Sequence, residues 1–195
     1  LKWSPSSNTL AFIRFDESQV PMYSMPMYEG DCHPNKDYSL YPGSYDYKYP
    51  VAGEKNSVVS VMAYDLATSR LQKMNLPITD NDYVPHIDYG TQDDRLMVST
   101  LNRTQNDLHI YAVNPATTQA TEVYAEQSTS WIDSKSANDV MYYDTFFVMP
   151  SEKSGYMHLY QYAYDGKLIK QLTSGNENVT EFYGYDKARK QFFYQ

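Results

Sequence analysis

Short apolar runs separated by polar turns recur along the whole chain, and this pattern predicts strands. Leu10 and Phe12 belong to one such run, and Val58, Val59 and Val61 belong to another. We find no stretch with a convincing amphipathic helical pattern. The 21 tyrosines also favour strands, because aromatic side chains fit a half-buried pleated surface. The sequence therefore predicts an all-β fold.

The strand pattern repeats with a period of about fifty residues. The phrases MAYDLAT, AVNPATT and YAYDGKL place Asp65, Asn114 and Asp165 at matching positions, with spacings of 49 and 51. Each is followed by a turn and another short strand. A repeat of this length is typical of a four-stranded antiparallel unit that packs against its own copies, which is a β-propeller blade.

A second phrase supports the repeat and exposes an insertion. Trp3, Tyr89 and Tyr185 each precede a polar turn, and their spacings are 86 and 96. The second spacing equals two plain repeats, whereas the first equals one repeat plus about forty residues. The extra residues lie within residues 12–61, which hold five of the ten prolines. Proline cannot donate to a central strand ladder, so this stretch interrupts a blade.

We therefore expect a partial β-propeller with about three blades and part of a fourth. The expected blades cover residues 1–77 (including the insertion), 82–127, 130–175 and, in part, 179–195. Propellers close with four to eight blades, so such a piece leaves blade faces and strand edges open to another chain. We expect the chain to be a segment of a longer protein, and two copies stacking their open faces is one further hypothesis.

Charge and composition exclude several classes of function. The net charge of −8, with only 16 Lys and Arg, argues against nucleic-acid binding, which needs clustered cations. No apolar run of about 18 residues is present, so we expect no membrane span. The single Cys32 leaves the redox compartment open.

Candidate catalytic and metal-binding residues are sparse. Residues 42–46 (PGSYD) approach the Gly-x-Ser-x-Gly elbow of serine hydrolases but lack its second glycine, so we expect a loop turn there. The four histidines do not pair at metal-ligand spacing. They are His33, His86, His109 and His158. His109 and His158 occupy equivalent strand positions and are expected to be packing residues, and no cofactor is implied.

Other polar and aromatic residues carry weaker signals. Carboxylate-rich turns usually solvate loops, although a calcium or acid–base role stays open for Asp80, Asp82, Asp93 and Asp94. The triplets at Asn102 and Asn178 match the N-glycosylation pattern. Trp131 opens the third expected blade, and core packing is its expected role, with a position facing the ring interior as the alternative.

Several longer phrases resemble the N-terminal β-propeller of the dipeptidyl peptidase IV family, especially its bacterial members. They are FIRFDESQVP, YPVAGEKN, LNRTQN, PSEKSGYMHLYQY and QLTSGNENVTEFYGYD. The resemblance implies a periplasmic, secreted or cell-surface serine exopeptidase that removes X-Pro or X-Ala dipeptides from peptide substrates. Its eight-bladed propeller would restrict access to a C-terminal α/β-hydrolase domain, which supplies the catalytic Ser, Asp and His.

The family's functional residues do not transfer to this chain. None of its catalytic triad matches a residue here, and its paired glutamates precede the WSP turn, so Leu1 comes after them. Its substrate-binding Phe-Arg pair would fall near residues 131–135, which read WIDSK. We therefore assign no catalytic or substrate contact and expect the segment alone to be inactive.

By the same resemblance, the insertion corresponds to an arm that packs across a homodimer, here residues 19–49. Its many apolar and aromatic groups would be unusual in a solvated loop. The residues expected in the interface are Val20, Pro21, Tyr23, Met25, Met27, Tyr28, Tyr41, Tyr45, Tyr47 and Tyr49. An arm folded back on its own blade is the alternative. Two further functions stay open for the chain: a stand-alone propeller scaffold that binds peptides or proteins, and a calcium-dependent lectin-like propeller.

Overall fold

The structure is a computed structural model that describes residues 1–28 and 43–195. It separates into two compact units. The first unit contains Leu1–Arg14 and Val59–Gln195, and the second contains Phe15–Val58. Tyr41, expected in the arm interface, lies outside the described residues.

The first four-stranded sheet brings the two ends of the insertion together. Its strands are β1 (Lys2–Trp3), β2 (Thr9–Asp16), β5 (Val58–Asp65) and β6 (Arg70–Lys73), hydrogen-bonded in the order β1-β2-β5-β6. Strands β2 and β5 are neighbours although more than forty residues separate them. The insertion therefore interrupts one sheet between its two middle strands.

The second sheet is an antiparallel meander. Its strands are β7 (Tyr83–Tyr89), β8 (Leu96–Leu101), β9 (Asp107–Val113) and β10 (Ala120–Gln127). Every residue of β8 is buried. A strand is buried throughout only when both faces of its sheet are covered.

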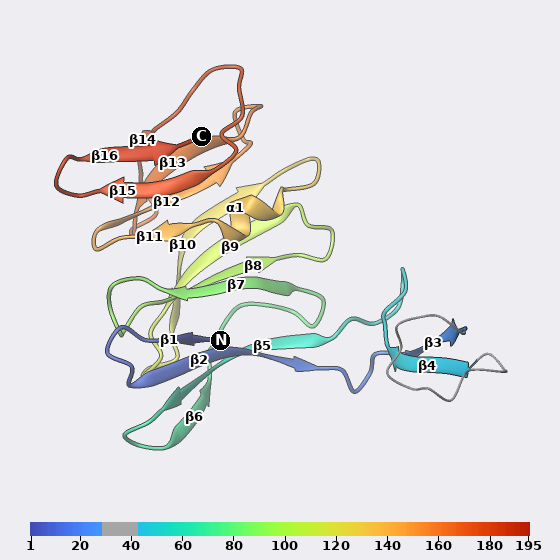
Figure 1. Cartoon of the computed structure of the whole chain (residues 1–195). Coiled ribbons are helices and arrows are strands. Elements are labelled where there is room, and N and C mark those ends of the chain that lie inside the picture. Colours follow the sequence, from blue (N-terminus) through green and yellow to red (C-terminus); the bar gives the residue numbers. More distant parts are fainter. Residues whose placement is uncertain (29–42) are drawn as a thin grey trace. The chain divides into compact units, whose positions relative to one another are not determined.

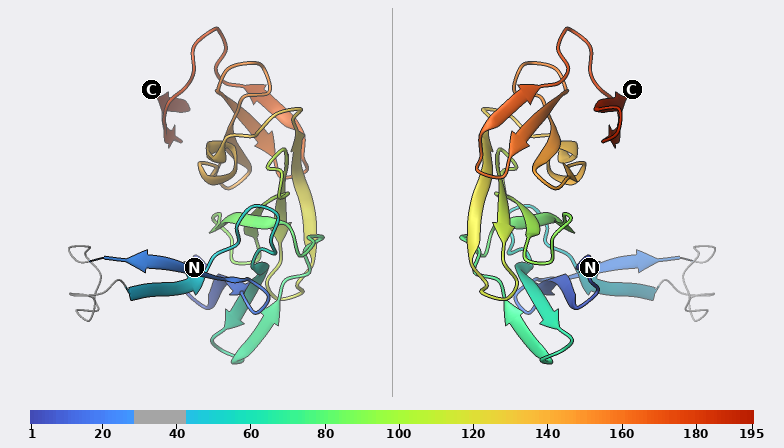
Figure 2. Two further views of the ribbon diagram at one scale, coloured as in Figure 1. Left: turned by 90° about the vertical axis from the view of Figure 1, so that its right-hand side faces the viewer. Right: turned by 90° about the vertical axis from the view of Figure 1, so that its left-hand side faces the viewer.

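The third sheet has the same order, and a two-stranded sheet follows it. The third contains β11 (Met141–Tyr142), β12 (Phe146–Ser151), β13 (His158–Ala163) and β14 (Leu168–Gln171). The last contains β15 (Phe182–Asp186) and β16 (Gln191–Tyr194). Within the first unit these sheets follow one another in chain order (Figure 1), and the two side views in Figure 2 show the same succession. The predicted all-β fold of four-stranded antiparallel sheets is confirmed.

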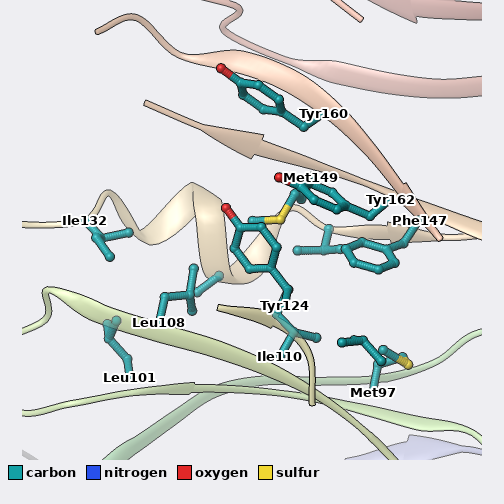
Figure 3. Close-up of a cluster of buried hydrophobic side chains, with 13 residues drawn as sticks. Met97, Leu101, Leu108, Ile110, Tyr124, Ile132, Phe147, Met149, Tyr160 and Tyr162 are labelled. Atoms are coloured by element: carbon teal, nitrogen blue, oxygen red, sulfur yellow. The ribbon is translucent and has the colours of Figure 1, made fainter. Parts of the chain in front are cut away.

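Apolar layers between consecutive sheets form the core. Leu96 and Val98 of β8 belong to a cluster with Val61 of the first sheet, whereas Met97 of β8 packs in a cluster with Phe147 of the third sheet. Figure 3 shows this second cluster. Alternate residues of a strand point to opposite faces, so β8 contributes to two cores at once.

Side-chain turns explain the sequence repeat. Asp65 Oδ1 accepts a hydrogen bond from the backbone N–H of Thr68 at 2.7 Å. Asn114 Oδ1 accepts from the N–H of Ala116 at 2.9 Å, and Asp165 Oδ1 accepts from the N–H of Lys167 at 3.1 Å. Asp and Asn recur because each closes the turn between the last two strands of its sheet.

One short helix was not predicted from the sequence. Helix α1 (Ser134–Asn138) has five residues, too few for an apolar period to be visible. Asp133 caps it by accepting from the N–H of Lys135 at 2.8 Å, and Ser136 and Ala137 are buried. Among the described residues, no helix is long and apolar enough to cross a membrane.

The second unit contains a hairpin of β3 (Met22–Met27) and β4 (Gly43–Lys48), which we call the arm hairpin. The expected loop turn at residues 42–46 is wrong for its described part, because residues 43–46 lie in β4. The whole of β4 pairs with β3, from Met22 opposite Lys48 to Met27 opposite Gly43.

Candidate functional site

The arm hairpin has one aromatic and one polar face. Met25 lies opposite Tyr45, and Tyr23 lies opposite Tyr47, so these four side chains share one face. The other face carries Ser24 opposite Asp46, with a hydrogen bond from Ser24 Oγ to Asp46 Oδ1. The alternation therefore gathers the tyrosines of the paired strands on a single side, whereas Met22 and Pro26 lie on the other.

Ring contacts order the aromatic face. The rings of Tyr45 and Tyr47 are stacked at a centroid distance of 5.3 Å, and the ring of Tyr23 meets that of Tyr47 edge-on at 5.9 Å. The ring of Tyr49 lies 5.7 Å from that of Tyr23. These contacts hold the rings in defined orientations, yet Tyr45 keeps 47% of its surface exposed.

The residues expected in the dimer interface are mostly at the surface. Tyr23, Met25, Tyr28, Tyr45 and Tyr49 are exposed. Those that are half-buried are Pro21, Met27 and Tyr47, and Val20 is buried. The aromatic face of the arm hairpin is thus a candidate docking surface.

A second candidate site surrounds Trp131, where the expected core packing is wrong. Trp131 is 56% exposed, and its Nε1 donates to Gln105 Oε1 at 2.9 Å. It follows β10 in a connection that packs Ile132 into the core, so successive side chains point in opposite directions. Trp131 lines an open pocket of about 460 Å³.

The pocket beside Trp131 is acidic, with a single lysine. Its charged side chains are Glu126, Asp133, Glu152 and Lys153. Ser151 Oγ donates to Glu126 Oε2 at 2.8 Å and so connects β12 to β10. The pocket lies at the junction of the second and third sheets.

Lys153 places its ammonium group against three tyrosine rings. Its Nζ lies 4.0 Å from the ring centroid of Tyr160, 4.9 Å from that of Tyr162 and 5.7 Å from that of Tyr124. Lys153 Nζ also donates to the hydroxyl of Tyr162, and the Tyr124 hydroxyl donates to Glu126. We call this group of Tyr124, Tyr160 and Tyr162 the tyrosine cage.

Burial and neighbouring charge shift the pKa values in the cage. Partial burial lowers the pKa of Lys153, against the opposing effect of the Glu126 carboxylate. Burial raises the pKa of Tyr162 to about 12, and burial followed by the charge of Glu126 raises the pKa of Tyr124. Tyr124 and Tyr162 are therefore neutral hydrogen-bonding groups near neutral pH.

A β-bulge aims Tyr124 into the cage. The pairing of β10 with β9 shifts register between Glu122 and Tyr124, so the consecutive residues Val123 and Tyr124 both enter the same core cluster. Bulges redirect side chains in this way. The sequence gives no direct signal of a bulge, which explains why the cage was missed.

The two repeat-related histidines have different environments. His158 is buried, with Nδ1 3.1 Å from Thr173 Oγ1 and Nε2 3.1 Å from the carbonyl oxygen of Gly175. His109 is half-buried between Glu122 and Asp107, with contacts of 2.8 and 3.1 Å. The packing role expected for both is compatible with these environments, since His158 is buried and the ring of His109 stacks on that of Tyr111 at a centroid distance of 5.9 Å.

Two of the acidic turns make structural contacts with backbone N–H groups, one between sheets and one within its own turn. Asp93 Oδ1 accepts from the N–H of Ser6 at 2.8 Å, and Asp82 Oδ2 accepts from the N–H of Thr79 at 2.7 Å. Across residues 1–28 and 43–195, no group of three or more His, Cys, Asp or Glu side chains could hold a metal ion.

All of residues 1–195 match the family model of the dipeptidyl peptidase IV (DPP IV) N-terminal region. The crystal structure of Porphyromonas gingivalis dipeptidyl peptidase 4 is similar with a TM-score of 0.89 and 39% identity, covering 100% of this chain and 26% of that one. A putative dipeptidyl aminopeptidase IV from Bacteroides ovatus has a TM-score of 0.82 and 26% identity, covering 98% of this chain and 29% of that one.

Relatives from eukaryotes are also named dipeptidyl peptidases. Dipeptidyl peptidase 4 of Arthroderma otae is 28% identical, covering 100% of this chain and 26% of the relative. Inactive dipeptidyl peptidase 10 of Rattus norvegicus is 28% identical, covering 98% of this chain and 25% of the relative. The chain therefore spans about a quarter of these relatives. Because the family model matches over the entire chain, the chain belongs to the dipeptidyl peptidase IV N-terminal region family.

Proposed function

We propose that the chain is a non-catalytic propeller segment of a serine exopeptidase that removes X-Pro or X-Ala dipeptides from peptide N-termini. The observation that carries this proposal is the family match along the whole chain, together with the coverage of only about a quarter of each relative. In the longer protein, a C-terminal α/β-hydrolase domain would supply the nucleophile. Each four-stranded sheet would be one blade, and the blades would restrict access of peptides to that domain.

The polar contacts of the described residues support a non-catalytic role. The contact between Thr173 and His158 joins a hydroxyl to an imidazole, as nucleophilic catalysis requires. However, both side chains are buried, and the third partner is the carbonyl of Gly175 where a catalytic triad has a carboxylate. Thr173 Oγ1 also accepts from the N–H of Leu159 at 3.0 Å, which is a structural role.

An assay of the intact natural protein tests the proposed activity. We expect release of p-nitroaniline from Gly-Pro and Ala-Pro p-nitroanilides and none from the N-acetylated versions, since a dipeptidyl peptidase needs a free N-terminus. Thr173→Val should leave kcat unchanged if the segment contributes no nucleophile. A folded protein without turnover of either free substrate would contradict the proposal.

A scaffold without catalysis is the second candidate. One relative at 28% identity is named an inactive dipeptidyl peptidase, so this family includes members without the activity. On this alternative the intact protein would bind peptides without cleaving them. Mass spectrometry of a peptide with proline at its second position separates the two, since only the exopeptidase shortens it by two residues.

The aromatic face of the arm hairpin supports the proposed homodimer. Met25, Tyr23 and Tyr45 are exposed on one side of a two-stranded sheet, and such a sheet is marginally stable on its own. Aromatic residues and Met are enriched in protein interfaces. A second copy covering this face would remove these groups from water and support the sheet.

The proposed location is periplasmic, secreted or at the cell surface, as the family relationship suggests. Fractionation of the native host, with the intact protein detected by antibody, checks this location. Recovery of the protein only with cytosolic markers would contradict it.

A further inference from the structure

We propose that the tyrosine cage is a binding site for a ligand with an organic ammonium group, and that Lys153 occupies it as a built-in competitor. The inference goes beyond the proposed peptidase function and does not depend on it. It rests on the arrangement of three rings, a carboxylate and an open pocket at the junction of two sheets.

The cage has the parts that recognise ammonium groups. Aromatic faces attract cations within about 6 Å of their centroids, and several rings around one point form the cages that bind choline or methylated lysine. Here the rings of Tyr124 and Tyr162 meet edge-on at 5.0 Å, and Tyr160 comes from the same strand and face as Tyr162. Figure 3 shows the hydroxyl ends of the three tyrosines pointing toward the same side.

The side chains of the cage are held in place by burial and by hydrogen bonds. All three tyrosines are buried, and Tyr160 donates from its hydroxyl to Ser154 Oγ at 2.8 Å. Glu126 is held by Ser151 at 2.8 Å and by the Tyr124 hydroxyl, so its carboxylate stays beside the rings. A cation in the cage would meet preorganised groups.

The resident ammonium can leave because Lys153 stands on an exposed turn. Residues 152–156 are exposed, and the N–H of Gly155 donates to the carbonyl of Glu152 at 2.8 Å to close the turn. Gly155 has φ +100°, which suits glycine. Outward rotation of Lys153 exchanges its hydrogen bond to the Tyr162 hydroxyl for hydrogen bonds to water, and the cation–π attraction that it gives up corresponds to about a two- to fivefold change in equilibrium at an exposed site.

The neighbouring pocket favours a cationic ligand. Lys153 and Glu126 line both the cage and the pocket of about 460 Å³, so rotation of Lys153 would open the cage toward that pocket. The pocket contains three carboxylates, those of Glu126, Asp133 and Glu152, against one lysine. This excess of negative charge attracts ammonium groups and repels anions. Trp131 adds an exposed indole at the same pocket.

Choline and its uncharged isostere 3,3-dimethyl-1-butanol test the proposal on the intact natural protein. The two have nearly the same shape, so a difference between them reports the charge. Isothermal titration calorimetry at constant ionic strength should show saturable choline binding and no binding of the isostere. Nα-acetyl-lysine amide as a third probe distinguishes a primary from a quaternary ammonium ligand.

Variants of Lys153 test the competition. Lys153→Met removes the resident charge and should tighten choline binding about two- to fivefold. Lys153→Arg keeps a competing cation and should stay near the wild-type affinity, as should Lys167→Met, which removes an exposed lysine from another turn of the same sheet. Glu126→Gln should weaken binding while the rings stay in place.

Three results would overturn the proposal. One is the absence of choline binding by both the wild type and Lys153→Met. The second is equal binding of choline and the isostere. The third is an affinity for choline that Lys153→Met and Glu126→Gln leave unchanged, since binding would then lie elsewhere. Circular dichroism and thermal melting confirm that each variant is folded before its affinity is compared.

Discussion

Ser99 of β8 donates from its buried hydroxyl to the backbone carbonyl oxygen of Ala137 at 2.9 Å. The contact joins the second sheet to the end of helix α1. Such a carbonyl cannot pair within a five-residue helix, because the last four carbonyls of a helix have no intrahelical donor. Ser99 therefore satisfies a helix end that is buried against the sheet.

Ser99→Ala should lower the free energy of unfolding by about 1–3 kcal/mol, since the Ala137 carbonyl would stay buried without its donor. Thermal or urea unfolding of the intact protein measures the change. Ser128→Ala is the matched control, because the Ser128 hydroxyl is not buried and its hydrogen bonds are local: it lies 3.3 Å from the Ser130 hydroxyl and accepts from the Ser130 N–H at 3.1 Å. Equal stability of the two variants would show that the contact contributes little.

Substitution on the aromatic face of the arm hairpin should weaken self-association. Tyr45→Arg places a charge where we propose that a second copy packs, so the dimer should dissociate at concentrations at which the wild type stays associated. Ser44→Arg is the control, since neighbouring residues of β4 point to opposite faces. Analytical ultracentrifugation of the intact protein measures both. Two variants that associate as the wild type does would refute the interface.

Removal of an aromatic ring from the core should markedly lower the free energy of unfolding. Phe147 is fully buried, and its ring stacks on that of Tyr162 at a centroid distance of 5.5 Å. Phe147→Ala should destabilise the protein by about 3–5 kcal/mol, because it removes apolar contacts and leaves a cavity. Phe193→Ala changes the same side chain where it is 45% exposed and should cost far less. Denaturant titration compares the two, and similar losses would contradict the assigned core.

Acid should weaken the contact between Asp88 and Lys2, whose Oδ2 and Nζ lie 3.0 Å apart. Partial burial alone would raise the pKa of Asp88, but contacts with His86 and Lys2 outweigh it and hold the pKa below the ordinary value of 3.8. The folded-state pKa is thus below the unfolded one. The carboxylate adds stability above about pH 3.8 and loses it as the pH falls through the folded-state pKa.

Melting temperatures between pH 2.5 and 6 test this linkage. Asp88→Asn should melt below the wild type at pH 6, and the difference should shrink toward pH 2.5. Asp94→Asn, on an exposed turn, serves as the control. A difference for Asp88→Asn that is constant across this range would exclude a contribution from its ionisation.

The sequence predicted the repeating features well. Asp65, Asn114 and Asp165 revealed the period because the same side-chain turn closes each sheet, and local hydrogen bonds of this kind leave a visible residue signature. The pairing of the two strands on either side of each turn could be predicted from the same residues, because a tight turn brings the strands that it joins side by side. The insertion was located because proline density and repeat arithmetic both depend on residue type alone.

Features that depend on three-dimensional register were not predictable. Trp131 faces water while Ile132 enters the core, and no pattern around them distinguishes these directions. Helix α1 is stabilised by the Asp133 cap and by the burial of Ser136 and Ala137, and its five residues are too few to show an apolar period. The tyrosine cage brings Tyr124 to a lysine 29 positions later, and this contact depends on a bulge whose location the residue types do not reveal.

Because alternate residues of β8 point to opposite faces, this one strand can report on two inter-sheet boundaries. Leu96 and Val98 face one apolar layer, whereas Met97 and Leu101 face the other. Adjacent residues of a single strand therefore sense two different inter-sheet boundaries. Isotope labels at Val98 and Met97 would show whether those boundaries loosen together or in sequence when the protein is heated.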